Sequence, residues 1–205
     1  MNIKHEIYRK IFHILLLIIP ITYCYLGKWQ SLMIFAPITA ILFSIDLLRQ
    51  KSAKTNAVFS KLFSLILRDR EKTGKSLCGA TFVGLAACIC FLLFTKEILV
   101  TGFLILAISD TLAALVGKTV KSKPFFEKSF AGSAAFFISA LVILIGCAIY
   151  YDVRAWFYIF GLFAVFCVTM FEARPSLIEI DDNFAIPVGF AVIMTFFDIA
   201  LNYNF

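Results

Sequence analysis

Charged side chains are scarce in this chain of 205 residues. Only 16% of the residues are charged, 61% are hydrophobic, and the mean hydropathy is +0.93. Soluble globular domains are about 45–50% apolar, so this balance excludes an ordinary water-soluble domain. The apolar residues also form uninterrupted runs instead of recurring at helix or strand spacing. The sequence therefore predicts an integral membrane protein whose apolar segments lie in lipid.

Metal-binding cysteine motifs are also missing. None of the six cysteines shows C-x-x-C spacing, which argues against a zinc site, and we expect them to be free thiols that pack as small apolar residues. The sequence has no internal repeat and no low-complexity tract, so we treat residues 1–205 as a single integral-membrane domain. The cysteines are Cys24, Cys78, Cys88, Cys90, Cys147 and Cys167.

The sequence also shows no signal-peptide cleavage site after its first apolar segment. The opening "MNIKHEIYRKIFHILLLIIP" has a basic start and an apolar core, but His13 interrupts the core and no small-x-small site follows. We interpret the segment as a first membrane helix.

Seven apolar runs approach the roughly 20 residues that a helix needs to cross a bilayer. We therefore predict an all-α polytopic membrane protein with about seven transmembrane helices. The runs lie near 8–26, 30–48, 77–95, 98–117, 131–151, 155–172 and 184–201.

Lysine and arginine are distributed very unevenly between the loops that these runs define. The N-terminus holds three, eight follow the second run, four follow the fourth and one follows the sixth, whereas the opposite side holds only Lys28, Lys96 and Arg154. The positive-inside rule predicts a cytoplasmic N-terminus. Within the long second loop, apolar residues recur at helical spacing, so we expect an amphipathic interfacial helix near residues 55–68. It would serve as a membrane-surface linker or as a lid for a lipid substrate.

Asp110 stands inside the fourth apolar run. A carboxylate in a membrane helix costs about 2.5–3.5 kcal/mol even on the more lenient scale, so it should face protein or water. It precedes Gly117 by seven residues, about 10 Å along a helix, which places it below the cytoplasmic rim. A structural role in helix packing is one interpretation, and a role in catalysis is the other.

The residues that follow Asp110 favour the catalytic interpretation. A basic loop leads into a Gly/Ser-rich helix start, and a helix N-terminus suits phosphate. The later stretch "EARPSLIEIDDNFAIP" adds carboxylates and an amide, which are oxygen ligands suited to Mg²⁺. Neither "DREKTGKS" nor "LAALVGKT" is a Walker A loop, because the first glycine of that motif is missing in both.

Four stretches resemble the membrane family of CTP-dependent lipid kinases, which includes dolichol kinase, phytol and farnesol kinases and the fungal CTP-using diacylglycerol kinase. The family is distantly similar to phosphatidate cytidylyltransferase. The stretches are "EIYRKIFH", "SLCGATFVGLA", "ISDTLAALVGKTVKSKPFFEKSFAGSAAFF" and "DDNFAIP". Ser109 departs from the glycine that many members have before the aspartate, and Phe130-Ala131 depart from the usual pair before Gly132.

The resemblance implies transfer of the γ-phosphoryl group of CTP, with Mg²⁺, to the hydroxyl of a membrane lipid alcohol such as a polyprenol, dolichol, diacylglycerol or phytol. It implies catalytic roles for Asp110, Arg9, Lys10 and Lys128. Nucleotide binding would fall to Gly117, Lys118, Lys121, Ser129, Gly132, Ser133 and Asn183. The metal ligands would be Asp110, Asp181 and Asp182, with Asp110 acting as a metal ligand or as the base.

Other functions stay open at this point. A cytidylyltransferase would make a CDP-lipid and release pyrophosphate, and a transporter would use Asp110 as a proton or cation relay. The expected partners are a lipid alcohol, a nucleotide and the bilayer, with no nucleic-acid polymer; the oligomeric state is not predicted. The short chain favours a prokaryotic plasma membrane over the endoplasmic reticulum, with the active site facing the cytoplasm.

Overall fold

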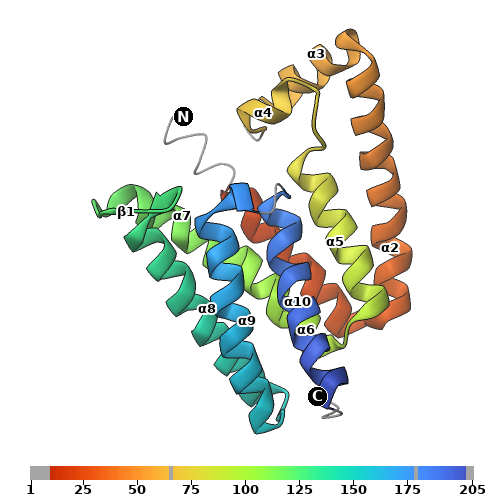
Figure 1. Cartoon of the computed structure of the whole chain (residues 1–205). Helices are drawn as coiled ribbons and strands as arrows, with labels where there is room; N and C mark the ends of the chain where they lie inside the picture. Colours follow the sequence, from red (N-terminus) through yellow and green to blue (C-terminus); the bar gives the residue numbers. More distant parts are fainter. Residues whose placement is uncertain (1–9, 65–66, 178–179, 202–205) are drawn as a thin grey trace.

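The computed structural model describes residues 10–64, 67–177 and 180–201. Helices make up nearly all of it, which confirms an all-α membrane protein (Figure 1). Residues 10–14 are helical and continue through η1 (Leu15–Leu17) into the next helix. The remaining helices are α2 (Ile18–Lys51), α3 (Ala53–Leu62), α4 (Asp69–Lys72), α5 (Gly79–Leu93), α6 (Lys96–Leu104), the π-helix η2 (Ile105–Ser109), α7 (Asp110–Thr119), α8 (Phe130–Tyr150), α9 (Ala155–Ala173), η3 (Pro175–Leu177) and α10 (Asp182–Leu201).

Five helical segments within the described ranges are long and apolar enough to cross a membrane. They are Lys10–Lys51, Lys96–Thr119, Phe130–Tyr150, Ala155–Ala173 and Asp182–Ala200. The predicted count of seven stays a prediction for two reasons. The first segment of 42 residues counts as one span although Gly27 breaks it, and α5 has only 15 residues, fewer than the roughly 20 of a full crossing.

Gly27 interrupts the long first segment. Its φ of 80° and ψ of −178° are non-helical. This left-handed backbone conformation is readily adopted only by glycine. At the break the chain reverses direction, so that residues 10–26 and the rest of α2 form two arms of a hairpin (Figure 1).

The helices pack into one bundle. α10 packs against α9, α5 and α6, α2 packs against α5, and α8 lies between α7 and α9. Aromatic side chains with almost no exposed surface fill the centre: Phe91, Phe103, Phe136, Phe157 and Phe190. The start of the first helical segment, α3, α4 and the hairpin formed by β1 (Pro124–Phe125) and β2 (Lys128–Ser129) gather at one end of the bundle, and α10 ends at the other (Figure 1).

The amphipathic helix is shorter than predicted. It begins at Ala53, where the Ser52 hydroxyl accepts a hydrogen bond from Thr55 N at 3.3 Å, and it ends at Leu62 instead of near residue 68. Residues 65–66 lie outside the described ranges, and Arg68 precedes the separate four-residue helix α4. Within α3, the side chains of Val58 and Leu62 are exposed, as an interfacial helix requires.

The basic loop after α7 contains a β-hairpin that the all-α prediction did not include. β1 (Pro124–Phe125) pairs antiparallel with β2 (Lys128–Ser129), and Pro124 lies opposite Ser129. Phe126, at the tip, has a φ of 52°. The hairpin orders the segment that leads into α8. All six cysteines are free, as expected, but only Cys78, Cys90 and Cys147 are buried, and Cys24 is exposed.

Candidate active site

A π-helical turn immediately precedes Asp110. Across this turn, Asp110 N donates to Ile105 O, five residues back, where an α-helix would use Leu106 O. Leu106 O instead lies 3.0 Å from His13 Nε2. A carbonyl oxygen only accepts hydrogen bonds, so Nε2 is the nitrogen of His13 that carries the proton. Single π-turns of this kind occur frequently at functional sites.

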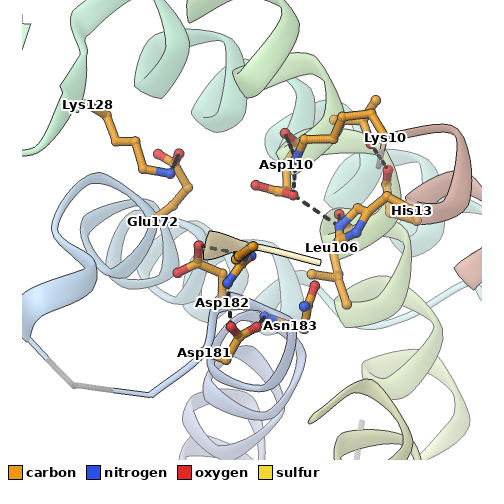
Figure 2. A network of polar contacts seen from close by, with 12 residues as sticks. Lys10, His13, Leu106, Asp110, Lys128, Glu172, Asp181, Asp182 and Asn183 are labelled. Atoms are coloured by element: carbon orange, nitrogen blue, oxygen red, sulfur yellow. Dashed lines mark hydrogen bonds and ion pairs between the residues drawn. The ribbon is translucent and has the colours of Figure 1, made fainter. Parts of the chain in front are cut away.

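Asp110 is buried and receives two donors from the first helical segment. Lys10 Nζ forms an ion pair with Asp110 Oδ2 and also lies 3.0 Å from the Asp110 carbonyl oxygen. His13 Nε2 lies 3.1 Å from the same Oδ2 (Figure 2). Lys10 itself is only 4% exposed. The structure thereby explains how a membrane helix accommodates the carboxylate, because positive charge and N–H donors surround it.

Asp110 and Lys10 line a cavity of about 510 Å³ at the hairpin end of the bundle. Its volume lies within the range of small-molecule sites, about 300–1,000 Å³. The lining comes from segments far apart in the sequence: Lys10, Arg68, Asp110, Ala113, Ala114, Gly117, Lys118, Ser122, Pro124, Glu127, Lys128, Ser129, Gly132, Glu172 and Asp182.

Positive and negative groups balance in this lining. The four cations are Lys10, Arg68, Lys118 and Lys128, and the four carboxylates are Asp110, Glu127, Glu172 and Asp182. Their formal charges cancel. A polyphosphate would therefore find cationic donors but no net positive cavity, so an accompanying divalent cation would favour its binding.

Gly117 and Gly132 line the cavity and also allow α7 and α8 to touch. A Cβ on Gly132 would lie 2.9 Å from Ala113 O and 3.2 Å from Gly117 Cα, both backbone atoms that cannot move aside. A Cβ on Gly117 would lie 2.8 Å from Ser129 Oγ. Both glycines are therefore required for close helix packing, a reason independent of any nucleotide.

The N–H groups at the start of α8 already have protein acceptors. Phe130 N donates to Lys123 O at 2.9 Å, Ala131 N to Ser122 Oγ at 3.0 Å and Gly132 N to Ser129 Oγ at 3.2 Å. The predicted cradle of backbone N–H groups for phosphate is thus occupied by the hairpin. Phosphate binding at this end of the cavity would depend on lysine side chains instead.

Lys128 points into the cavity from β2 and is paired with a buried carboxylate. Its Nζ lies 3.0 Å from Glu172 Oε1 on α9 (Figure 2). Burial by itself would lower the pKa of Lys128, but the Glu172 carboxylate, with smaller contributions from Asp182 and Asp110, raises that pKa above its ordinary value. Lys128 is therefore a cation at neutral pH.

Asp181, Asp182 and Asn183, at the start of α10, make different contacts. Asp181 caps α10, since its Oδ1 accepts from Asn183 N at 3.0 Å, and its Oδ2 pairs with Arg68. Of Asp181, Asp182 and Asn183, Asp182 is the one that lines the cavity, 4.0 Å from the Arg68 guanidinium. Asn183 is buried against Gly79 at the start of α5, where its amide nitrogen would lie 2.6 Å from a Cβ.

The predicted metal ligands are therefore only partly brought together. In the described part of the chain, no group of three or more His, Cys, Asp or Glu residues could hold a metal ion. Mg²⁺ usually takes one or two carboxylates and completes its shell with waters and substrate phosphates. Asp110 and Asp182 line one cavity and fit that mode, whereas both oxygens of Asp181 are engaged elsewhere.

Other predicted residues lie outside the cavity. Lys121 is exposed and is not part of the lining. Ser133 is buried and donates to Glu172 Oε2 at 3.3 Å, behind Lys128. Arg9 lies outside the described residues.

Comparison with known proteins places the chain among relatives. It is 34% identical over 197 residues to the uncharacterized protein RP860 of Rickettsia prowazekii, covering 92% of this chain and 93% of that protein. This chain belongs to the RP860 family. It is also 30% identical over 139 residues to the uncharacterized protein MJ1137 of Methanocaldococcus jannaschii, covering 67% and 66% of the two chains. No family model and no solved structure matches.

Three charged side chains of the cavity, Arg68, Glu127 and Glu172, were not assigned a role from the sequence of this RP860-family chain. In the sequence, Arg68 is one of many basic residues in its loop, and Glu172 belongs to an acidic stretch. Arg68 pairs with a residue 113 positions away, and Glu172 with one 44 positions away. A marked amphipathic segment before Arg68 and an acid at the end of an apolar run were the only local signals.

Proposed function

We propose that this protein is a membrane-embedded kinase that transfers the γ-phosphoryl group of CTP to the hydroxyl of a membrane lipid alcohol, giving a lipid phosphate and CDP. The observation that supports the proposal best is that one cavity holds the predicted groups. The cavity gathers Lys10, Asp110 and Lys128 from three distant segments and adds Asp182 from a fourth. The choice of CTP rests on the family resemblance of those segments.

The proposed topology has seven crossings, with the two arms on either side of Gly27 and the short helix α5 each crossing once. The N-terminus and the cavity would face the cytoplasm. The concentration of lysine and arginine in the N-terminus and in the loops after the second and fourth runs supports this orientation. Relatives in two prokaryotes support a location in a prokaryotic plasma membrane.

Phosphoryl transfer needs mainly positioning and neutralisation of charge. Lys10, Lys118, Lys128 and Arg68 are the cations that can hold phosphate oxygens in this cavity. A Mg²⁺ ion, when bound by Asp110 and Asp182, would neutralise charge on the transferred phosphate. Asp110 either serves that ion or orients the lipid hydroxyl. Both roles need an ionised carboxylate, and the neighbouring Lys10 ammonium group stabilises its charge.

The proposal is tested by following a γ-labelled nucleotide with the purified protein in detergent. CTP and ATP are each supplied with Mg²⁺ and one of a polyprenol, a diacylglycerol or phytol. The proposal expects label in the lipid and CDP in solution. Release of labelled pyrophosphate with formation of a CDP-lipid would contradict it in favour of a cytidylyltransferase. Absence of transfer with every alcohol and both nucleotides would also contradict it.

A further inference from the structure

Glu172 occupies a place where a carboxylate is costly. It lies in the last turn of α9 with only 3% of its surface exposed. The C-terminal end of a helix carries partial negative charge, and burial removes the hydration of an ion. A neutral residue would pack there at lower cost, so the charge calls for an explanation beyond packing.

The surroundings of Glu172 supply one. Its two oxygens contact two other elements, Lys128 Nζ on the hairpin at 3.0 Å and Ser133 Oγ on α8 at 3.3 Å. The backbone makes a parallel link, since Glu127 N donates to Ala173 O at 3.1 Å. The end of α9 therefore fixes the hairpin at two adjacent points, one on the main chain and one on the lysine ammonium group.

Lys128 and Glu172 also differ in their exposure. Both side chains line the cavity, but the Lys128 side chain is 35% exposed and the Glu172 side chain only 4%, so the ammonium group is the accessible member of the pair and the carboxylate is largely covered. Figure 2 shows this pair standing apart from the group formed by Lys10, His13 and Asp110. The other carboxylates that act on Lys128 are Asp182 on α10 and Asp110 on α7, and neither has a hydrogen bond to it among the contacts of the described residues.

We infer that Glu172 is a positioning residue, which acts through Lys128 by holding that ammonium group where it binds the phosphates of the nucleotide. This inference rests on the proposed function, and it adds to that function a residue that does not touch the substrate. The Glu172 carboxylate fixes the position of the Lys128 ammonium group, and that ammonium group contacts the phosphates.

The inference predicts the direction in which neutralising Glu172 changes the affinity for a triphosphate. If Glu172 were only a carboxylate near the phosphates, its neutralisation would remove repulsion, and a triphosphate would bind more tightly. If Glu172 positions Lys128, its neutralisation releases the lysine, and the triphosphate binds more weakly. Glu172→Gln separates the two, and its amide oxygen can still accept a hydrogen bond from Ser133.

The experiment measures the Kd of CTP with Mg²⁺ for the full-length protein in detergent, without the lipid alcohol. The variants are Glu172→Gln, Lys128→Gln, the double variant, and Asp152→Asn as a control at the exposed loop between α8 and α9. We expect Glu172→Gln to raise the Kd about tenfold, as for the loss of one charge-assisted contact. In the Lys128→Gln background the same change should cause no further weakening.

Three results would overturn the inference: tighter binding by Glu172→Gln, unchanged binding, or an equal weakening with and without Lys128. Failure of the wild-type protein to bind CTP would instead overturn the proposed function together with the inference that rests on it. Thermal unfolding of each variant identifies loss of fold. If Glu172→Gln does not fold, Ser133→Ala replaces it, because that change loosens Glu172 while keeping its charge, and it should also raise the Kd.

Discussion

At the scale of single residues, the central feature is a carboxylate that a membrane helix keeps buried. Asp110 tolerates this position because Lys10 and His13 both reach its Oδ2. The π-turn before it leaves Leu106 O free to accept from His13, so His13 contacts both this carbonyl oxygen and the Asp110 carboxylate. This arrangement brings the first helical segment to the cavity, where Lys10 joins cations from the rest of the chain.

Replacement of Asp110 by Asn should abolish this local charge balance without removing volume. We expect CTP-dependent phosphorylation to fall by a factor on the order of 100 or more, because an electrostatic group at the reacting centre is lost. Turnover is measured with γ-labelled CTP, and folding is checked by thermal unfolding. Asp152→Asn, in the loop between α8 and α9, should keep wild-type turnover. Near-normal turnover of Asp110→Asn would remove Asp110 from the mechanism.

The raised pKa of Lys128 predicts how stability depends on pH. A lysine whose pKa is raised on folding stabilises the protein fully below its ordinary value of 10.5, and that contribution disappears as the pH rises through the raised value. The melting temperatures of wild type and of the double variant Lys128→Gln/Glu172→Gln should therefore differ by a constant amount between about pH 7 and about pH 10. Above this window the melting temperature of the wild type should fall relative to that of the double variant. A difference that changes steadily below about pH 9 would contradict the pKa direction.

At the scale of elements, the crossing of α7 and α8 fixes one wall of the cavity. Gly132 and Gly117 permit the close approach, while Ser129 and Ser122 satisfy the first N–H groups of α8. The hairpin that carries Lys128 leads directly into this crossing. The position of Lys128 thus depends on helix packing as well as on Glu172.

The crossing can be tested with two glycines of the same helix. Gly132→Ala should destabilise the protein by about 1–3 kcal/mol, because its Cβ would press on the backbone of α7. Gly146→Ala has no heavy atom within 4 Å of the added Cβ and should be neutral or slightly stabilising. Unfolding in denaturant, followed in detergent, compares the two. Equal effects of both changes would argue against the crossing.

The sequence predicted elements better than it predicted side-chain directions. Apolar runs identify membrane helices because composition alone decides which segments prefer lipid. Asp181, Asp182 and Asn183 are adjacent, yet successive residues at a helix start point about 100° apart, so Asp182 alone enters the cavity. The π-turn and the hairpin have no strong local signal. Arg68 and Glu172 were not predicted to line the site because their partners lie far away in the sequence.

At the scale of the whole molecule, function requires that all groups of the cavity open to one side of the bilayer. The hairpin, α4 and the start of the first helical segment gather at the same end of the bundle, and the loop after α8 lies at the other (Figure 1). The proposed topology places the first end in the cytoplasm. Nucleotide would then reach the cavity from the aqueous side where it is available.

This orientation is tested by labelling single cysteines in cells with a membrane-impermeant maleimide. In a variant whose six native cysteines are replaced, a cysteine at Asp152 should react from outside, and a cysteine at Lys121 should react only after the membrane is permeabilised. Both positions are exposed in the structure. Labelling of both from the same side would contradict the proposed topology.

The most direct measurement of the central claim is an experimental structure of the protein with Mg²⁺ and a non-hydrolysable CTP analogue. The account predicts that the triphosphate lies in the cavity between Lys10 and Lys128, with the metal ion at Asp110 and Asp182. A nucleotide bound at any other place would contradict it.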